Sequence, residues 1–275
     1  MIRKSLFILT LGAILVSYII PVTASAQATK SIEPFKVGTF AINDVPTIGL
    51  VMRDDSLVID LIVANRAMEL IPHYSKLSMP KNMLGLIEQY EYGLKYRIYE
   101  IINWLVEDNH LGSNNRPSYV HPVSSVDIMA PIQYPSKIMN AAVNFYTHAC
   151  EGCSDEQLAA QTLERRENRG VPYLFLKPTR GVVIGDGEDI IMPYGRDQIE
   201  WEVEMAIVFG RSGKYISSSR AYDHVFGYMV AMDISDRGGR PPGGYGSGSD
   251  WFVGKGHDTF APQGPWIVPK EFYGD

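Results

Sequence analysis

The pattern of hydrophobic and polar positions divides the chain into two parts that differ in the helices and strands they predict. In the first part, short apolar runs at residues 36–40, 47–52 and 57–61 are separated by polar turn residues, a pattern that predicts three strands. Residues 64–70 have a helical pattern, and apolar residues recur every three or four positions in a longer stretch at 81–107. We therefore predict a small α+β module over residues 27–122.

After the polar, proline-containing stretch 112–123, short β-type runs dominate. They lie at residues 138–143, 173–176, 181–184, 190–192, 202–209 and 225–232. Many short strands separated by glycine and proline favour a barrel or a sandwich. We predict a mixed, mostly β domain over residues 123–275 and an α+β fold class for the chain.

The first 26 residues have the pattern of a secretory signal peptide. Arg3 and Lys4 precede an almost wholly apolar run at residues 5–20, and small residues follow at 24–26. We expect cleavage after Ala26 and a periplasmic or secreted mature protein with no membrane partner. The alternative is a membrane anchor, although the run is shorter than the roughly 20 residues that a spanning helix needs.

The composition and net charge of the chain indicate a globular protein and argue against one class of binding partner. The chain is 45% hydrophobic and 20% charged, as is usual for a globular protein. Its net charge of −6 argues against nucleic acid as a partner. Only two cysteines are present, so the core must supply the stability that a disulfide framework supplies in many small exported domains.

Three glutamates alternate along the predicted strand at residues 199–209. Because successive side chains of a strand point to opposite faces, Glu200, Glu202 and Glu204 share one face. The second half of the run is unbroken and apolar, so we expect a buried strand, in which such carboxylates are costly without a cation. A hard divalent cation takes oxygen ligands and solves that problem. The alternative is an edge strand whose glutamates face water.

Polar residues follow the next apolar run, at 225–231. Asp233 lies at its end, which makes it a good third ligand, and Arg237 supplies a bidentate donor suited to a substrate carboxylate. The alternative interpretation of this segment is an ordinary turn, because Asp, Ser and Gly are common at strand ends.

Two further groups suit catalysis. His148 and Glu151 would be neighbours on one helical turn, and a carboxylate that orients an imidazole suits a general base acting on water. Lys255 lies between two glycines, so its ammonium could reach into a site and polarise a carbonyl. The alternatives are a surface contact for the His–Glu pair and an ordinary solvated lysine in a loop.

The residues of these motifs and their order along the chain resemble those of the fumarylacetoacetate hydrolase family. This family is described together with 2-keto-4-pentenoate hydratase-type enzymes. The resemblance covers residues 126–269. It is carried by Ala130-Pro131 with Pro135, residues 144–151, Phe175-Leu176-Lys177-Pro178, Glu202-Val203-Glu204, residues 233–237, and Gly254-Lys255 through Gly264-Pro265-Trp266. It implies a mixed β-roll or barrel, often dimeric, so a homodimer is one of the states left open.

The resemblance also implies a metal site and a substrate. Glu202, Glu204 and Asp233 match the family's metal-binding carboxylates, which usually hold Mg²⁺ or Mn²⁺, with Ca²⁺ as a further candidate. Arg237 matches the residue that meets the acidic end of the substrate, and Thr259 matches a neighbouring polar contact. The implied substrate is a small 2-oxo or 1,3-dicarbonyl acid.

The remaining matches imply a metal-dependent hydrolase or lyase. His148 and Glu151 correspond to a dyad that activates water on a short mobile lid, and Lys255 corresponds to the active-site lysine. The expected reaction is C–C cleavage of the acylpyruvate type, or decarboxylation or hydration. The alternative is a non-catalytic, truncated family member that binds a divalent metal or a small acid.

Among the departures from the family pattern are the two cysteines and the position of the chain end. Cys150 and Cys153 lie around the expected base, and in an oxidising compartment they could form a C-x-x-C disulfide or act as a redox pair. The alternative is two free or bridged cysteines of the lid without a catalytic role. The chain also ends at Asp275, where family members usually continue. We therefore expect a catalytic domain that is incomplete at its C-terminus, with an open sheet edge that invites aggregation or pairing.

Overall fold

The computed structural model describes residues 28–168, 170–238 and 250–274, so the predicted signal peptide at residues 1–26 lies outside the described residues. The three strands predicted in the first part are present. The elements of this part are β1 (Lys36–Ile42), β2 (Val45–Met52), β3 (Leu57–Asp60), α1 (Leu61–Met68), α2 (Met83–Gln89), α3 (Lys95–Glu107), β4 (Val120–Pro122) and β5 (Asp127–Met129).

The helix predicted over residues 81–107 is divided. A π-helical segment, Tyr90–Leu94, joins α2 to α3, and Gly93 within it has a φ of +118°. Glycine adopts such a backbone conformation easily because it has no Cβ. The apolar period of this stretch was therefore predicted correctly, but the prediction of one continuous helix was wrong.

The second part consists of short strands with small helices between them. Its elements are β6 (Ile138–Ala141), α4 (Tyr146–Ala149), α5 (Asp155–Glu167), β7 (Leu174–Lys177), β8 (Val183–Ile184), β9 (Ile199–Glu200), β10 (Val203–Phe209), β11 (Val225–Met232), β12 (Ser235–Asp236), α6 (Trp251–Lys255) and β13 (Ala261–Pro269). Residues 190–192 are not a strand, and that prediction was wrong. Instead, the Ile191 amide donates a hydrogen bond of 2.8 Å to the Thr259 hydroxyl.

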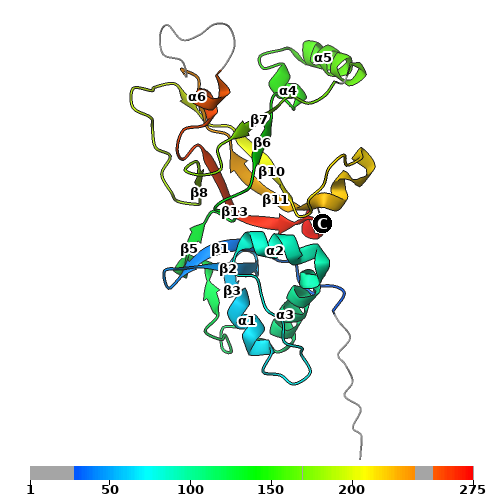
Figure 1. The fold of residues 1–275 in the computed structure, drawn as a ribbon, viewed down its shortest axis with the longest axis vertical. Helices are drawn as coiled ribbons and strands as arrows, with labels where there is room; N and C mark the ends of the chain where they lie inside the picture. Colours follow the sequence, from blue (N-terminus) through cyan, green and yellow to red (C-terminus); the bar gives the residue numbers. More distant parts are fainter. Residues whose placement is uncertain (1–27, 169, 239–249, 275) are drawn as a thin grey trace, which may run out of the picture.

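One large sheet runs through both parts of the chain (Figure 1). Its main strand order is β10-β11-β13-β1-β2-β3-β4, with β5 also paired to β1 and β8 to β13. The two parts join where Val37 of β1 lies opposite Ile267 of β13. The α+β fold class is confirmed. The domain boundary at residue 122 falls inside a continuous sheet and stays a prediction.

The main hydrophobic core lies between this sheet and α1–α3. Leu50, Ile59 and Ile98 from the first part are inaccessible to solvent, as are Phe226 and Ile267 from the second. Tyr90 packs edge-on against the ring of Phe226, with 4.9 Å between ring centroids. The first part therefore supplies most of the core, and β11 and β13 are anchored on it.

Strand β10 lies at the edge of the sheet, since within the described residues it pairs only with β11. One of its faces carries Val208, which is 6% exposed and packs on the core. The other face presents Val203, Met205, Ile207 and Phe209, which are 48–59% exposed. The expectation of a fully buried strand was therefore wrong, and the edge carries an uncovered apolar row.

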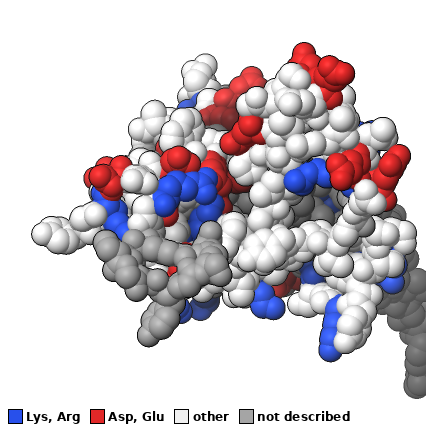
Figure 2. Space-filling view, turned by 90° about the horizontal axis from the view of Figure 1, so that it is seen from above, with Lys and Arg blue, Asp and Glu red and all other residues white. Residues whose placement is uncertain are grey.

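The surface shows no single-sign charge field on the face seen from above. Acidic and basic side chains are interspersed there, and a broad uncharged area lies between them (Figure 2). Among the helices that the structure describes, none is long and apolar enough to span a membrane.

Candidate active site

Two antiparallel strands bring the predicted carboxylates together. Val203 at the start of β10 lies opposite Met232 at the end of β11. Just beyond this pair, the Asp233 amide donates a 2.9 Å hydrogen bond to the Glu202 carbonyl. Because antiparallel strands place the beginning of one beside the end of the other, Glu202, Glu204 and Asp233 gather at one end of the sheet.

Two buried lysines hold Asp233 between them. Lys177, at the end of β7, places Nζ 2.5 Å from Oδ1, and Lys255, at the end of α6, places Nζ 2.6 Å from Oδ2. Lys255 also lies 3.0 Å from Oε2 of Glu202. Lys177, Asp233 and Lys255 are each at most 5% exposed. Since an unpaired buried charge is costly, each of these groups depends on the others.

Lys177 was not among the predicted site residues. Burial lowers the pKa of Lys177, and the negative charge of Asp233 partly opposes that shift. The sequence does contain a signal for Lys177, because this lysine ends the apolar run of β7. A buried lysine is rarely found without a partner of opposite charge. Its partner, however, lies 56 residues away in the chain and could not be identified from spacing.

Glu204 is the half-buried carboxylate of the cluster. Burial raises the pKa of Glu204, and the negative charges of Asp233 and Glu202 raise it further, while Lys255 and His148 oppose the shift. Asp233 and Glu202 therefore make the electrostatic potential at Glu204 more negative, and a cation placed near it would be stabilised.

The donor set is chemically suited to a hard divalent cation, which prefers carboxylate oxygens. Among the described residues, however, no three His, Cys, Asp or Glu side chains already surround a common point as metal ligands. In this arrangement Glu202 and Asp233 both point at the Lys255 ammonium. The crowding of negative charge at Glu204 favours a cation, and the ligand set Glu202, Glu204 and Asp233 stays a prediction.

Arg237 lies beside the carboxylates. Its Nε is 2.8 Å from Oε2 of Glu200, and a second contact joins its guanidinium to Glu202. The Ser235 hydroxyl also donates to Glu202, at 3.1 Å. Glu200, which lies outside the expected ligand set, thus has its counter-charge in Arg237. The predicted contact of Arg237 with a substrate carboxylate stays a prediction.

Thr259 is buried, and its hydroxyl makes contacts within the protein. It donates to the Asp258 carbonyl at 2.6 Å and accepts from the Ile191 amide. Its φ of +67° marks a sharp turn of the chain after α6. Thr259 therefore fixes the segment near residue 191 in place, and its predicted role as a substrate contact stays a prediction.

His148 and Glu151 lie on a small lid formed by α4, α5 and the turn between them. The Nδ1 atom of His148 is 2.5 Å from Oε1 of Glu151. The same turn contains a disulfide between Cys150 and Cys153. The charge of His148 opposes the rise in the pKa of Glu204, so this segment contributes to the electrostatics of the carboxylate cluster. A carboxylate that holds one ring nitrogen leaves the other free for proton transfer.

A second buried carboxylate, Asp236, was not among the predicted site residues. Its Oδ2 is 3.1 Å from Nε of Arg196 and 3.2 Å from Nε2 of His257. Arg196 also donates to the Gly238 carbonyl at 2.9 Å. These contacts tie together the segments that carry Arg196, Asp236 and His257. Only the tertiary structure identifies them, because the three side chains come from distant parts of the chain.

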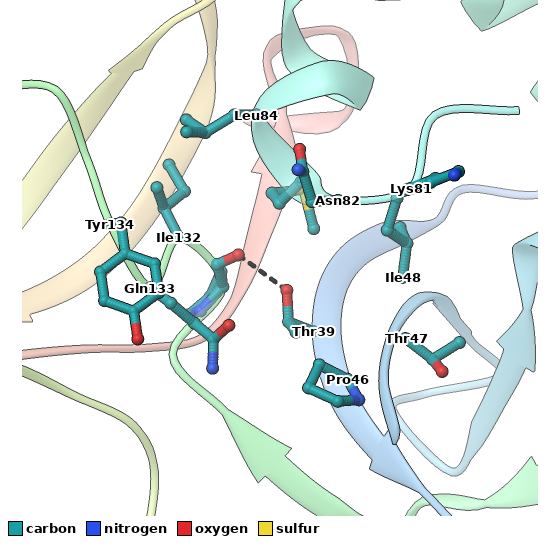
Figure 3. A pocket seen from close by; sticks show the side chains of 12 residues that line it. Thr39, Pro46, Thr47, Ile48, Lys81, Asn82, Leu84, Ile132, Gln133 and Tyr134 are labelled. Carbon is teal, nitrogen blue, oxygen red and sulfur yellow. Dashed lines mark hydrogen bonds between the residues drawn. The ribbon is translucent and has the colours of Figure 1, made fainter.

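A separate hollow of about 110 Å³ lies between the β1–β2 hairpin, the start of α2 and residues 131–134 (Figure 3). The Thr39 hydroxyl donates to the Pro131 carbonyl at 2.8 Å beside it. Tyr134 and Gln133 border it, and none of the predicted site residues does. This hollow is therefore distinct from the carboxylate cluster.

A comparison with protein families gives one match. Residues 137–275 match the family described as fumarylacetoacetate (FAA) hydrolase C-terminal. The matched segment contains every predicted site residue.

Relatives of known name are similar to this chain over part of their length. It is 33% identical over 159 residues to a mitochondrial oxaloacetate tautomerase, FAHD2A, of Bos taurus, a match that covers 57% of this chain and 45% of the relative. It is 29% identical over 230 residues to the mitochondrial oxaloacetate tautomerase fahd2 of Xenopus laevis, which covers 84% and 60% respectively. The chain thus spans about half the length of the curated relatives it matches.

Solved structures share the fold. Maleylpyruvate hydrolase from Sphingobium sp. SYK-6 aligns with a TM-score of 0.57 and 23% identity, over 87% of this chain and 69% of that protein. A structure of the same hydrolase with manganese(II) and pyruvate aligns with a TM-score of 0.56. At this level of identity the likeness concerns the fold.

Proposed function

The chain belongs to the fumarylacetoacetate hydrolase family, and from that premise we propose that it is a metal-dependent enzyme that forms the enolate of a small 2-oxo acid. Keto–enol tautomerisation of oxaloacetate or a similar 2-oxo diacid is the reaction that we favour. The named relatives at 29–33% identity, which are oxaloacetate tautomerases, support this choice.

One observation carries the proposal: the Lys255 ammonium lies between Glu202 and Asp233 at the end of the sheet. The His148–Glu151 pair supplies an oriented imidazole, and the proposal requires the lid to close over this end of the sheet. A fixed ammonium in a water-poor site stabilises an oxygen that gains negative charge, and an oriented imidazole accepts a proton. Those are the two functions that enolisation requires.

Each residue of the site would have its own role in the reaction. Arg237, beside the cluster, would hold a carboxylate of the substrate through paired hydrogen bonds, in exchange for one of its present glutamate contacts. His148, oriented by Glu151, would remove the proton from the carbon next to the ketone. Lys255 would donate a hydrogen bond to the oxygen on which the charge develops. Return of the proton to that oxygen gives the enol.

A divalent cation held by Glu202, Glu204 and Asp233 would supply Lewis-acid stabilisation of the same oxygen. The carboxylates suit Mg²⁺ or Mn²⁺, and a manganese complex of a protein with this fold supports that choice of ion.

A second candidate is hydrolysis of a C–C bond in an acylpyruvate. The His148–Glu151 pair favours it, because the same imidazole can take a proton from water and the resulting hydroxide can attack a carbonyl. The leaving enolate would then be stabilised by Lys255. The two reactions differ in whether the substrate is cleaved.

Calorimetric titration of the full-length chain with Mn²⁺ tests the proposal first. We expect saturable binding in the wild type and its loss in Glu204→Gln. Glu200→Gln is the matched control, since Glu200 precedes the same strand and contacts Arg237 but lies outside the ligand set. Oxaloacetate ketonisation, followed by the loss of enol absorbance, and acylpyruvate cleavage are then measured with and without a chelator.

Turnover of either substrate that needs the ion and Glu204 would support an enzyme and choose between the two reactions. Undiminished turnover in Glu204→Gln with a chelator present would refute metal dependence. Metal binding without turnover of either substrate would favour the non-catalytic alternative.

A further inference from the structure

The disulfide on the lid encloses one member of the His148–Glu151 pair. Cys150 follows the last residue of α4, and Cys153 directly precedes Ser154, which caps α5. Glu151 thus lies inside a closed four-residue ring. Within this ring the Cys153 amide donates to the Cys150 carbonyl at 3.0 Å. The backbone that carries Glu151 is therefore held on both sides.

Apart from this ring, the contacts that hold the pair are weak, such as the Arg166 guanidinium of α5, which lies 5.5 Å from the centroid of the Tyr146 ring of α4. The side chain of His148 is 43% exposed and that of Glu151 is 73% exposed. None of the residues of α4 or α5 is buried, and the two helices project from the body beyond β6 and β7 (Figure 1). An exposed ion pair contributes only about 0–1 kcal/mol, because water competes for both groups. Packing and charge alone would leave this contact loose.

The contact also decides which ring nitrogen is available. A carboxylate only accepts hydrogen bonds, so Nδ1 of a neutral His148 carries the hydrogen when it contacts Glu151. Nε2 is then the free acceptor that a base needs. If the contact opened, the imidazole could place its hydrogen on either nitrogen.

We infer that the Cys150–Cys153 disulfide is a positioning element that holds Glu151 against Nδ1 of His148 and so keeps Nε2 ready to accept a proton. The inference rests on the proposed function for its catalytic meaning. Reduction by a dithiol transfers two electrons and two protons to the two sulfur atoms, and the dithiol leaves as its own disulfide. The lid then keeps its sequence but loses the ring around Glu151. Such a disulfide suits the oxidising compartment in which export would place the chain.

The tautomer of His148 is the direct measurement. Nitrogen-15 spectra of the full-length chain distinguish the two ring nitrogens, and the His148 signals among the six histidines are identified by their absence in His148→Gln. Above the pH at which the ring is protonated, we expect the Nδ1–H form in the oxidised protein. After reduction, or in the double variant Cys150→Ser with Cys153→Ser, we expect a mixture of both forms.

Ser154→Ala is the matched control. It removes the hydrogen bond from the Gln157 amide to Oγ of Ser154, and with it the cap of α5, but leaves the ring intact. We expect this variant to keep the Nδ1–H form. An unchanged tautomer after reduction, or loss of the Nδ1–H form in Ser154→Ala, would overturn the inference, because lid order in general and not the disulfide would then set the contact.

Kinetics separate this inference from the proposed function. With the reductant removed before assay, we expect kcat to fall by about tenfold with KM nearly unchanged, a part of the roughly 10²–10⁴ that a positioned base contributes. Reoxidation should restore kcat. A shift of tautomer without turnover in either state would refute the proposed function and support the positioning role. Turnover with equal kcat in both states would overturn the catalytic meaning of the disulfide.

Discussion

The two ends of the large sheet are stabilised in opposite ways. Around β1–β4 most of the buried side chains are apolar, and α1–α3 cover them in one continuous core that includes Leu50, Ile59 and Ile98. Around the start of β10 the buried groups include a cluster of charges, with Lys177 and Lys255 held on Asp233. There the large apolar side chains of β10 face outwards.

This contrast shows which end of the sheet can hold buried charges that lower the stability of the fold. A buried cluster of charges contributes little net stability, because removing the ions from water offsets their attraction. Burial of apolar surface, by contrast, stabilises a domain in proportion to the area removed from water. The first end of the sheet therefore supplies the stability on which β11 and β13 rest, and the other end can carry chemistry.

The largest expected effect comes from opening the charged cluster. Asp233→Ala leaves Lys177 and Lys255 buried without their shared counter-charge, so we expect a loss of about 3–5 kcal/mol in the free energy of unfolding, together with loss of turnover. Urea denaturation measures it. Adding Lys177→Met should recover part of the stability, because one unpaired charge is removed. If Asp233→Ala unfolds at the wild-type urea concentration, the cluster does not form in solution.

The same truncation at each end of the sheet sharpens the comparison. Ile98, in α3, is inaccessible to solvent, so Ile98→Ala should cost about 2–5 kcal/mol. Ile207, in β10, is 48% exposed, so Ile207→Ala should cost roughly 0.5 kcal/mol or less. Both are measured by denaturation, with Mn²⁺ affinity of the folded protein unchanged. An equal cost at both positions would mean that the outer face of β10 is covered in solution.

The smallest effect tests a charge at the apolar end. The Leu77 amide donates to Glu69 at 2.6 Å and, despite the opposing effect of burial, this bond and those from Asn65 and Arg97 hold the pKa of Glu69 below its ordinary value of 4.5. A lowered folded-state pKa contributes stability that is present above pH 4.5 and is lost as the pH falls through the folded-state pKa. Glu69→Gln should therefore cost about 1 kcal/mol at pH 7 and close to nothing at strongly acidic pH.

Denaturation midpoints across this pH range check the prediction, with Glu88→Gln as a control at an exposed glutamate on α2. A difference between Glu69→Gln and wild type that is constant with pH would show that the carboxylate charge is not what stabilises this network.

Local pattern predicted much of the secondary structure. The strands expected near residues 36–40, 47–52 and 57–61 are β1, β2 and β3, because alternation and turn residues depend only on the nearby backbone. The helix predicted over residues 81–107 failed at Tyr92 and Gly93, since periodicity over many residues does not register a short local break. The prediction of a buried strand from the apolar run of β10 failed for a different reason. Whether a strand has neighbours on both sides depends on the whole sheet, and β10 lies at its edge.

What the sequence by itself determined is the chemistry of the site: carboxylates at alternate positions before and in β10, an aspartate after β11, a lysine between glycines, and a histidine one turn from a glutamate and two cysteines. These are properties of residue type and short spacing. The tertiary structure alone decided which charges meet. It placed Lys177 on Asp233 and Arg237 on Glu200, and it joined β1 to β13 in one sheet. Such contacts link residues far apart in the chain, and the packing of the whole fold selects them, because the cost of burying each charge depends on the counter-charge that the fold supplies.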